Sequence, residues 1–425
     1  MSSAELAETQ LEQLRSLVAE LFPGNRFYSS KLAAAGVTFD VGGLADYSKR
    51  FPFTHKSELV ADQMAEPPYG TNLTYPLTSY TRCHQTSGTR GSPLRWLDTE
   101  ESWAGLVESW IEVWRAAGLQ PGDRVFFAFS FGPFIGFWLA FESAAKLGGL
   151  CLPGGGLSSA ARLRSILEQG ATHLCCTPTY AIRLAEVASE EGISLQGSPV
   201  RGLIVAGEPG GSIPAVRTRL ETMWPGARVF DHHGMTETGP VSYECPARPG
   251  VLHVIERSYF AEIVDPASGA ARRSGETGEL VLTTLGRTAS PLLRYRTGDL
   301  VCSSEASPDA PCACGRFELA LEGGILGRTD DMVVIRGVNV YPSAVDEIVR
   351  SCPAAGEYLV EVREARGLAE LNLKVEPSES GESSGLVREL ERRFETALAL
   401  RVNIEVLARG TLPRYEMKAR RWVRK

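Results

Sequence analysis

The stretch HQTSGTRGSP (residues 84–93) combines hydroxyl side chains with glycines, as phosphate-binding loops do. Gly88 and Gly91 permit a tight turn whose backbone N–H groups point inward and can hold a polyphosphate. Hydroxyl donors in the same stretch are Thr86, Ser87 and Thr89. Ser92 stands where the G-x-x-x-x-G-K-[ST] signature would have its lysine, so the stretch gives little support to an ordinary P-loop kinase or ATPase. Taken alone, the stretch predicts a phosphate site and a polar surface turn equally well.

Four further motifs follow in order along the chain: HHGMTETG (232–239), YRTGDL (295–300), GRTDDMVVIRG (327–337) and LPRYEMK (412–418). With the first stretch, they resemble the acyl-adenylate-forming superfamily of acyl- and aryl-CoA synthetases, peptide-synthetase adenylation domains and luciferases. The segments RFYSSKLAAAGV, FPFTHKSEL and PPYGTN resemble the phenylacetate-CoA ligase branch in particular. The resemblance covers nearly the whole chain.

The elements that must position these motifs follow an α/β pattern. From about residue 123 to 231, short apolar runs alternate with helical stretches, which predicts βαβ units and a parallel sheet with ligands at its carboxyl edge. Residues 251–301 predict a β-rich module. The chain restarts as an α+β unit after GRTDD. We expect a large N-terminal adenylation domain (1–326) and a small, mobile C-terminal domain (327–425), with the hinge near Asp330.

The resemblance implies that ATP activates a carboxylate. The carboxylate attacks the α-phosphate, pyrophosphate leaves, and an acyl-AMP remains. Glu237 matches the Mg²⁺ carboxylate, and Thr236 matches a residue that contacts the α-phosphate. Lys418 matches the catalytic lysine, whose charge stabilises the meeting of phosphate and carboxylate. The residue before that lysine is usually glycine and is Met417 here.

Further residues match the segments that bind the nucleotide. Those around the base and the phosphates are Gly207, Glu208, Pro209, Asp231, His232, His233, Gly234 and Thr236. Asp299 and Arg328 match the residues that contact the ribose hydroxyls. The alternative for Asp299 is an ordinary turn aspartate after Gly298.

The second half-reaction transfers the acyl group to the thiol of coenzyme A. In the family, the C-terminal domain rotates between the two reactions, and Asp330 matches the hinge residue. Rotation withdraws Lys418 and brings Arg336 and Gly337 to the pantetheine path. The chain contains no carrier domain, so delivery to a separate acyl carrier protein stays open, as does a non-catalytic nucleotide-binding relative.

The acid-binding pocket is expected at the start of the FIGFW helix and at HHGMTE. Its residues would be Phe131, Phe134, Ile135, Gly234 and Met235. Aromatic side chains favour a ring over a long flexible chain, although phenylalanine on a buried helix is as often core. We expect an aromatic acid of the benzoate, anthranilate or phenylacetate type, with His233 near a ring substituent. A small branched hydroxy acid stays open.

Cysteine spacing indicates a second, structural site. Cys245 and His253 lie in ECPARPGVLHV, and PCACGR adds Cys312 and Cys314. Three thiolates and one imidazole satisfy tetrahedral Zn²⁺, and relatives in this branch resemble this arrangement around a structural metal. Buried unligated thiols are the alternative.

Composition is that of an ordinary globular protein. The 425 residues carry a formal charge of −7, which gives no reason to expect nucleic acid or an anionic membrane as partner. The N-terminus predicts an amphipathic helix with a capping box of Ser2 and Glu5, and neither a signal peptide nor a membrane span. Nine scattered cysteines favour a reducing, cytoplasmic compartment. A homodimer stays open.

Overall fold

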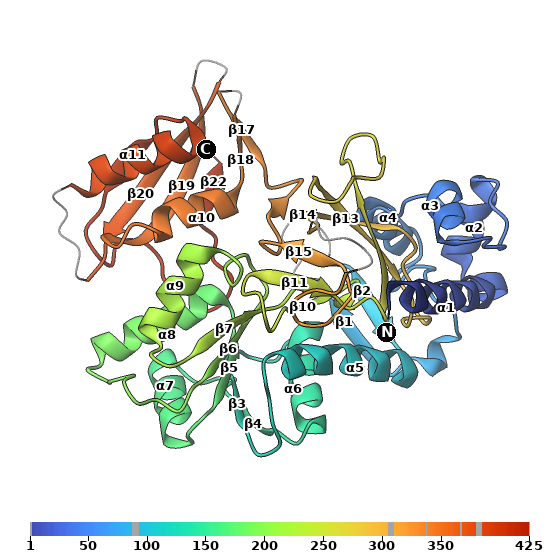
Figure 1. Cartoon of the computed structure of the whole chain (residues 1–425), viewed down its shortest axis with the longest axis horizontal. Coiled ribbons are helices and arrows are strands. Elements are labelled where there is room, and N and C mark those ends of the chain that lie inside the picture. Colours follow the sequence, from blue (N-terminus) through green and yellow to red (C-terminus); the bar gives the residue numbers. More distant parts are fainter. Residues whose placement is uncertain are drawn as a thin grey trace. The chain divides into compact units, whose positions relative to one another are not determined.

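The computed structural model describes residues 2–86, 93–304, 310–336, 338–365, 368–379 and 385–424 (Figure 1). The chain forms two compact units. Unit 1 contains Met1–Gly155 and His232–Gly324, and unit 2 contains Gly156–Asp231 and Ile325–Lys425. Each unit is therefore assembled from two separate stretches of chain. The division into domains at residues 326 and 327 stays a prediction.

Unit 1 begins with helices. They are α1 (Ser3–Gly24), α2 (Arg26–Ala34), α3 (Leu44–Arg50), α4 (Lys56–Ala65), α5 (Glu100–Ala116) and α6 (Ile135–Lys146). The predicted capping box is confirmed: Ser2 Oγ accepts from the Glu5 backbone N–H, and Glu5 Oε2 accepts from that of Ser2. Leu14, Val18 and Leu21 share one buried face of α1, in a core that includes Leu293.

The strands of unit 1 form small sheets. A hairpin joins β1 (Arg82–Gln85) and β2 (Arg95–Asp98), while β3 (Arg124–Phe127) and β4 (Leu150–Pro153) pair in parallel. The predicted β-rich module is confirmed as antiparallel sheets. One contains β12 (Tyr259–Val264), β13 (Thr277–Thr284) and β14 (Tyr295–Cys302); the other contains β10 (Ser242–Glu244), β11 (Val251–Val254) and β15 (Ala320–Glu322).

Unit 2 confirms the βαβ alternation. Its parallel strands β5 (His173–Cys176), β6 (Gly202–Val205) and β7 (Arg228–Asp231) are buried on nearly every residue, as parallel strands covered on both faces are. The helices of this part are α7 (Ser159–Glu168), α8 (Pro178–Glu190) and α9 (Pro214–Met223). Thr177 caps α8 by accepting from the Tyr180 N–H, and Pro178 occupies the first turn.

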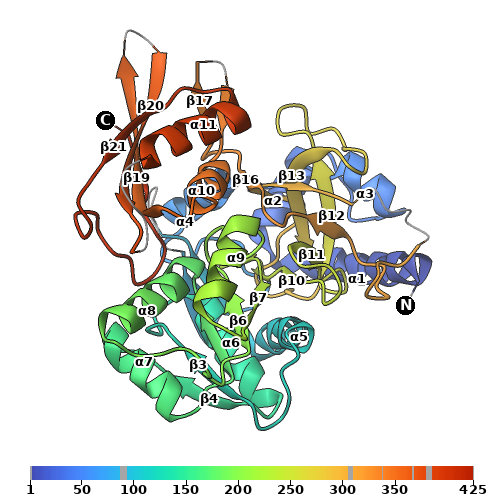
Figure 2. The same cartoon turned by 60° about the vertical axis from the view of Figure 1, so that its left-hand side comes forward.

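The C-terminal part of unit 2 has its own core. Its main sheet has the order β21-β20-β19-β22, and α10 and α11 cover one face of it in both views (Figures 1 and 2). These elements are β19 (Ala355–Ala365), β20 (Leu368–Pro377), β21 (Asn403–Val406), β22 (Trp422–Arg424), α10 (Pro342–Arg350) and α11 (Leu386–Leu398). The short strands β16 (Gly327–Arg328), β17 (Val333–Ile335) and β18 (Val338–Val340) precede them.

The last twelve residues of the sequence include six basic side chains, a composition typical of a solvated tail, but the end of this segment is partly buried and forms a strand. Arg421 is buried and forms an ion pair with Glu357, with 2.5 Å between Nε and Oε1. Residues 422–424 form β22 beside β19. Although burial opposes ionisation, Arg350 and Arg421 hold the pKa of the Glu357 carboxyl down at about 2. Net charge along the sequence does not reveal a paired, buried arginine.

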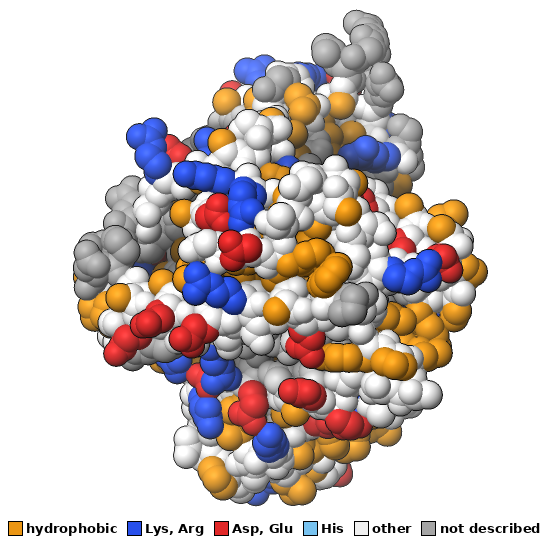
Figure 3. All heavy atoms as spheres, turned by 90° about the vertical axis from the view of Figure 1, so that its right-hand side faces the viewer, with side chains coloured by type: hydrophobic (Ala, Val, Ile, Leu, Met, Phe, Trp, Pro, Cys, Tyr) orange, Lys and Arg blue, Asp and Glu red, His pale blue; other side chains and the backbone are white. Residues whose placement is uncertain are grey.

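The surface mixes both charges. On the face drawn in Figure 3, acidic and basic side chains are interspersed with apolar ones. Within the part of the chain that the structure describes, no helix combines the length and the apolar character needed to cross a membrane.

Replacing Phe394 with alanine should destabilise the C-terminal core. Phe394 is fully buried on the same face of α11 as Leu386 and Leu390, so truncation leaves a cavity that costs about 3–5 kcal/mol. Native-state hydrogen exchange of the amides of β19 and β20 measures the loss. Glu391→Ala, on the exposed face of the same helix, is the control and should change opening by less than about 0.5 kcal/mol. Equal effects of the two variants would contradict the packing described.

Candidate active site

The stretch predicted to hold phosphates begins in unit 1 at Thr86, directly after β1, and rejoins β2 through Leu94. Thr86 N–H donates to the Leu94 carbonyl (2.9 Å), and Thr86 Oγ1 accepts from the Leu94 N–H (3.0 Å). The Gln85 N–H donates to the carbonyl of Pro133, in the loop that precedes α6 (2.8 Å). The structure thus brings Thr86 beside the start of α6. The other predicted loop residues, Ser87, Gly88, Thr89 and Gly91, lie outside the described residues.

The predicted acid-pocket residues at the start of α6 belong to an aromatic cluster. Phe131 packs against Phe129 and Trp138, with ring centroids 5.4 and 4.9 Å away. Phe134 contacts Phe137, which stacks on Phe129 at 4.0 Å. Ile135, the first residue of α6, is buried. Phe131 and Phe134 keep partly exposed rings, whereas Ile135 is core.

The two other predicted pocket residues form the strand β8 (Gly234–Met235), which pairs with β9 (Gly239–Pro240) in a tight hairpin. A Cβ on Gly234 would lie 2.7 Å from the Gly239 carbonyl oxygen, so only glycine permits this close approach. Met235 packs against the cluster of Leu59, Trp96 and Tyr295. Helix α6 runs next to both strands. Unit 1 therefore places the hairpin and the aromatic helix side by side.

A buried ion pair fixes the residues between β8 and β9. Arg287 binds both oxygens of Asp98, at 2.7 Å from Nε and 2.6 Å from Nη2. Its Nη1 donates to the backbone carbonyls of Thr236 and Glu237, each at 2.9 Å. The exposed fraction of the Arg287 side chain is 2% and that of Asp98 is 0%. One guanidinium therefore ties β2 to the backbone of the predicted catalytic residues.

The carboxylate of Glu237 is buried and paired with a lysine. Lys56 Nζ lies 2.8 Å from Oε1, and Tyr295 Oη donates weakly to the same oxygen at 3.4 Å. Lys56 comes from the first turn of α4, and its side chain is 51% exposed. Lys56 was not among the predicted site residues, although it lies in the segment FPFTHKSEL. The residues on either side of it are polar as well, so the local sequence does not mark this lysine.

The histidine pair before Gly234 has two different environments. The His232 ring packs against Trp110 at a tilt of 52° (centroids 4.4 Å apart), and its Nδ1 lies 2.6 Å from the Ser242 carbonyl. Burial lowers the pKa of His232 to about 4, so the ring is a neutral donor to that carbonyl. His233 Nε2 lies 3.0 Å from Oδ2 of Asp299. The predicted ribose carboxylate thus contacts the residue predicted to lie near the acid.

In unit 2, the structure brings Lys418 to the loop after β6. Gly207 has φ +93°, and a Cβ there would lie 3.2 Å from Lys418 Cε and 3.8 Å from Thr177 Cγ2. A side chain at position 207 would therefore be strained and would press on the stem of the lysine. Glu208 accepts from the backbone N–H groups of Thr179 (2.9 Å) and Ala419 (2.8 Å).

The remaining predicted residues of unit 2 are spread over several loops. Asp231, at the end of β7, accepts a hydrogen bond from Ser212, and Pro209 is exposed. Arg328 lies 3.0 Å from the predicted hinge residue Asp330. Arg336 pairs with Glu370 (3.0 Å) and has a left-handed φ of 50°, while Gly337 lies outside the described residues. Roles for these residues in ribose or coenzyme A binding, and as a hinge, stay predictions.

The four predicted metal ligands meet in unit 1. Their ligand atoms all lie within 4.8 Å of one another. Cys245 Sγ is 3.7 Å from Cys312 Sγ, and Cys314 Sγ is 3.4 Å from His253 Nε2. The other ring nitrogen of His253 lies 3.1 Å from the Glu318 carbonyl, and donation to it leaves Nε2 as an electron-pair donor. Burial lowers the pKa of His253, which also favours the neutral imidazole.

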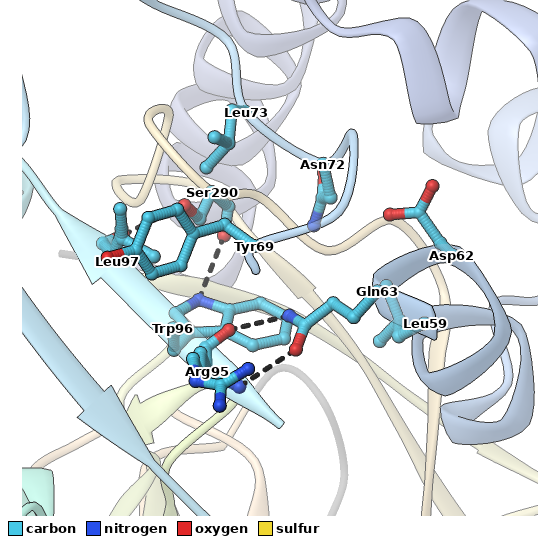
Figure 4. Close-up of a pocket in the computed structure, with 10 residues that line it drawn as sticks. All are labelled: Leu59, Asp62, Gln63, Tyr69, Asn72, Leu73, Arg95, Trp96, Leu97 and Ser290. Atoms are coloured by element: carbon cyan, nitrogen blue, oxygen red, sulfur yellow. Dashed lines mark hydrogen bonds between the residues drawn. The ribbon is translucent and has the colours of Figure 1, made fainter. Parts of the chain in front are cut away.

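A shallow pocket lies between α4 and β2 in unit 1 (Figure 4). Gln63 forms two hydrogen bonds with the backbone of Arg95, and Trp96 Nε1 donates to the Ser290 carbonyl at 3.2 Å. Its lining includes none of the residues predicted for acid or nucleotide. Trp96 nevertheless connects this pocket to the candidate site. Its side chain also packs with Met235, and its ring lies 5.5 Å from the Arg287 guanidinium.

Arg287→Met should destabilise unit 1 strongly. It leaves the buried Asp98 carboxylate without its cation, and breaking such a pair costs about 3–5 kcal/mol. Hydrogen exchange of β2 and the 234–240 hairpin measures the loss. The double variant Arg287→Met/Asp98→Leu should recover part of it, because no charge is then buried alone. The matched control is Arg164→Met in an exposed pair with Glu191, which should cost less than about 1 kcal/mol. A similar cost for both arginines would contradict this account.

Two models of known protein families match separate stretches of the chain. Residues 85–287 match the family model described as AMP-binding enzyme, and residues 337–425 match that of the AMP-binding enzyme C-terminal domain. The chain is 34% identical over 379 residues to a phenylacetate-coenzyme A ligase of Thermus thermophilus, covering 88% of this chain and 82% of that protein. It is 31% identical to the phenylacetate-coenzyme A ligase of Escherichia coli, covering 98% of this chain and 94% of that protein.

A solved structure agrees over the whole chain. 2-Hydroxyisobutyryl-CoA ligase, in the postadenylation state in complex with 2-HIB-AMP, matches with a TM-score of 0.94 and 30% identity, covering 100% of this chain and 90% of that one. The predicted fold class and the enzyme class, a CoA ligase family, are thereby confirmed. The chain belongs to the acyl-adenylate-forming superfamily of AMP-binding enzymes, in its phenylacetate-CoA ligase-like branch.

Proposed function

We propose that this protein is an AMP-forming aryl-acid:CoA ligase. The observation that carries the proposal is the arrangement around Lys418, whose stem lies against Gly207 in the loop after β6. Parallel sheets bind ligands outside the carboxyl ends of their strands, so this lysine is at the edge where a nucleotide would sit. The relatives named above support the same reaction.

In the first half-reaction, the acid's carboxylate oxygen attacks the α-phosphate of ATP and pyrophosphate leaves. Lys418 supplies positive charge where negative charge gathers. The Thr236–Glu237 backbone is held by Arg287, so both side chains enter the reaction pre-positioned. Asp299 and Arg328 bind the ribose. In the second half-reaction, the thiolate of coenzyme A attacks the acyl carbon and AMP leaves, with Arg336 and Gly337 along the pantetheine path after rotation near Asp330.

Glu237 fits a magnesium ligand. Mg²⁺ prefers anionic oxygens and is commonly held by one or two carboxylates together with substrate phosphates. Glu237 already faces a cation in this structure, the Lys56 ammonium, so the site favours positive charge. Lys56 is half exposed and can turn toward a phosphate when the metal occupies Oε1. The metal would neutralise phosphate charge, while Glu237 and Lys56 orient the polyphosphate.

The aromatic cluster at the start of α6 supports an aromatic acid. Phe131 and Phe134 retain exposed ring surface beside the β8–β9 hairpin, and aromatic rings pack well against one another. His233 can donate to a ring substituent, which suits an aminobenzoate or hydroxybenzoate. A small branched hydroxy acid is the second candidate, because the solved relative at 30% identity acts on 2-hydroxyisobutyrate according to its name.

Pyrophosphate release with ATP and Mg²⁺ should identify the acid. We expect release with at least one of benzoate, anthranilate, phenylacetate and their hydroxy derivatives, and acyl-CoA formation when coenzyme A is added. Faster release with 2-hydroxyisobutyrate than with every aryl acid would replace the aryl proposal by the second candidate. Release without acyl-CoA formation would point to a carrier-protein thiol as acceptor. No release with any acid would refute the enzymatic function.

Lys418→Ala should separate the two half-reactions. We expect adenylation to fall by about 10²–10³-fold, because a cation beside the transferring phosphate is lost. Formation of acyl-CoA from supplied acyl-AMP should stay within about threefold, since the lysine is withdrawn for that step. Lys146→Ala, in an exposed pair with Glu108, is the control and should leave both rates unchanged. Equal loss of both half-reactions would contradict the proposed role.

We also propose that Cys245, His253, Cys312 and Cys314 hold a structural Zn²⁺. Thiolates bound at about 2.3 Å from a tetrahedral ion lie about 3.8 Å apart, and the 3.7 Å between Cys245 and Cys312 fits this edge. Four protein ligands close the coordination sphere, as in structural rather than catalytic sites. The site would fasten the 312–318 loop to β11.

Metal analysis of the purified protein tests the zinc site. We expect about one Zn²⁺ per chain in the wild type, and a clear loss in Cys312→Ser. Cys83→Ser, which changes an exposed cysteine outside the cluster, should keep the full content. The same metal content in all three proteins would refute this ligand set.

A further inference from the structure

The side chain of Glu208 joins two parts of unit 2 that are far apart in sequence. One carboxylate oxygen accepts from the Thr179 N–H in the first turn of α8 (2.9 Å). The other accepts from the N–H of Ala419, the residue after Lys418 (2.8 Å). Both donors are backbone groups, so this link depends on Glu208 alone and on no side chain of the lysine loop. Sequence analysis had placed Glu208 at the nucleotide.

Three further contacts attach the lysine loop to the starts of α7 and α8. Thr177 Oγ1 donates to the Met417 carbonyl (3.2 Å), and Ser159 Oγ donates to Glu416 Oε1 (3.0 Å). Arg421 Nη1 donates to Thr179 Oγ1 (3.2 Å). Together with the Glu208 bond to Ala419, these contacts involve two residues on each side of Lys418: Glu416 and Met417 before it, and Ala419 and Arg421 after it. Lys418 itself therefore projects from a loop that is held at both ends.

Glu208 differs from the other partners in charge and position. A carboxylate is favoured at a helix N-terminus, where unpaired N–H groups carry partial positive charge. Hydrogen bonds to a charged acceptor are also stronger than neutral ones. Because Glu208 follows Gly207 directly, it ties Ala419 to the loop against which the Lys418 stem rests. The two neighbouring residues thus position the lysine side chain in different ways. Gly207 leaves space for its stem, and Glu208 holds the backbone N–H of Ala419, the residue that follows the lysine.

We propose that Glu208 is a positioning residue for Lys418, acting in adenylation and not in thiol transfer. The proposal rests on the proposed function, because it assigns a partner to the lysine of the first half-reaction. When the C-terminal domain rotates, Glu208 keeps its bond to Thr179 in α8 and gives up Ala419. The hydrogen bond to Thr179 is therefore present in both states, whereas the one to Ala419 is present only in the adenylation state.

The decisive variant is Glu208→Gln, which keeps the size of the side chain and one acceptor oxygen but cannot accept both N–H groups. We expect the kcat of acid-dependent pyrophosphate release to fall about tenfold, the effect of losing one charge-assisted hydrogen bond. The KM for ATP should stay within about twofold, and acyl-CoA formation from supplied acyl-AMP should be unchanged. Glu208→Asp keeps the charge with a shorter reach and should lie between the wild type and Glu208→Gln.

The matched control is Glu191→Gln at the other end of α8. Glu191 also accepts a hydrogen bond, from Arg164 at 2.8 Å, and it caps the C-terminal end of α8, opposite the end that contacts the lysine loop. Both rates should stay at the wild-type value. A higher KM for ATP with unchanged kcat in Glu208→Gln would overturn the proposal in favour of a nucleotide contact. Equal loss of both half-reactions, or no loss of either, would overturn it as well.

Hydrogen exchange keeps this proposal separate from the proposed function. In the ligand-free protein, the segment 413–424 should exchange faster in Glu208→Gln than in the wild type, while Glu191→Gln leaves it unchanged. Unaltered exchange of that segment in Glu208→Gln would overturn the anchoring role, whatever the enzyme's activity. Failure of the wild type to release pyrophosphate with every acid tested would instead refute the ligase function, and the exchange result would still decide the anchor.

Discussion

The buried pair of Arg287 and Asp98 is the interaction on which the geometry of unit 1 depends. Two charges removed from water are tolerated only when their remaining hydrogen-bonding groups are satisfied. Here the Asp98 carboxylate accepts hydrogen bonds from two N–H groups of Arg287. The third guanidinium nitrogen, Nη1, donates to two backbone carbonyls. The strand β2, the 236–237 backbone and the segment after β13 cannot move independently without leaving a charge unpaired. The predicted catalytic residues therefore inherit their rigidity from a pair that has no role in the chemistry.

Lys418 is held in a different way. Its loop is attached to the start of α8 by hydrogen bonds that are partly exposed, and the lysine stem lies along a glycine rather than in a core. Such contacts are individually modest and can be exchanged for water. The same unit also has a well-packed C-terminal core, from Val333 to Trp422, that does not depend on them. A firm core with a weakly attached functional loop suits an enzyme family whose catalytic lysine has to leave between two reactions.

Much of the fold could be predicted from local patterns. The βαβ alternation between residues 123 and 231 and the 3.6-residue period of Leu386, Leu390 and Phe394 follow directly from side-chain order. That Cys245, His253, Cys312 and Cys314 lie together could be predicted from their residue types and the resemblance to the family, because their spacing alone is a weak signal. Motif order identified the family, and the residues proposed to contact the nucleotide come from the same motifs.

The supporting residues escaped prediction for a physical reason. Arg287, Asp98 and Lys56 have no neighbours in sequence that mark them, since their partners arrive from strands and helices far along the chain. The basic residues after Lys418 looked like a solvated run because burial of Arg421 depends on Glu357, in a distant strand. Glu208 was placed in the right loop, but its side chain satisfies backbone donors that no sequence pattern exposes. Which charged side chains pair in the folded protein cannot be predicted from the local sequence around each of them.

The parallel pairing of β22 with β19 has a consequence for how the protein is made. Val360 in β19 pairs with Trp422, so β19 acquires its second neighbour from residues translated after all three other strands of the sheet. Non-local pairings of this kind raise contact order and slow folding, and an unpaired strand edge is prone to intermolecular association meanwhile. During synthesis, the edge of β19 stays open until residues 422–424 emerge. The loop that carries Lys418 lies directly upstream of β22, so we expect it to become ordered only when this strand pairs with β19.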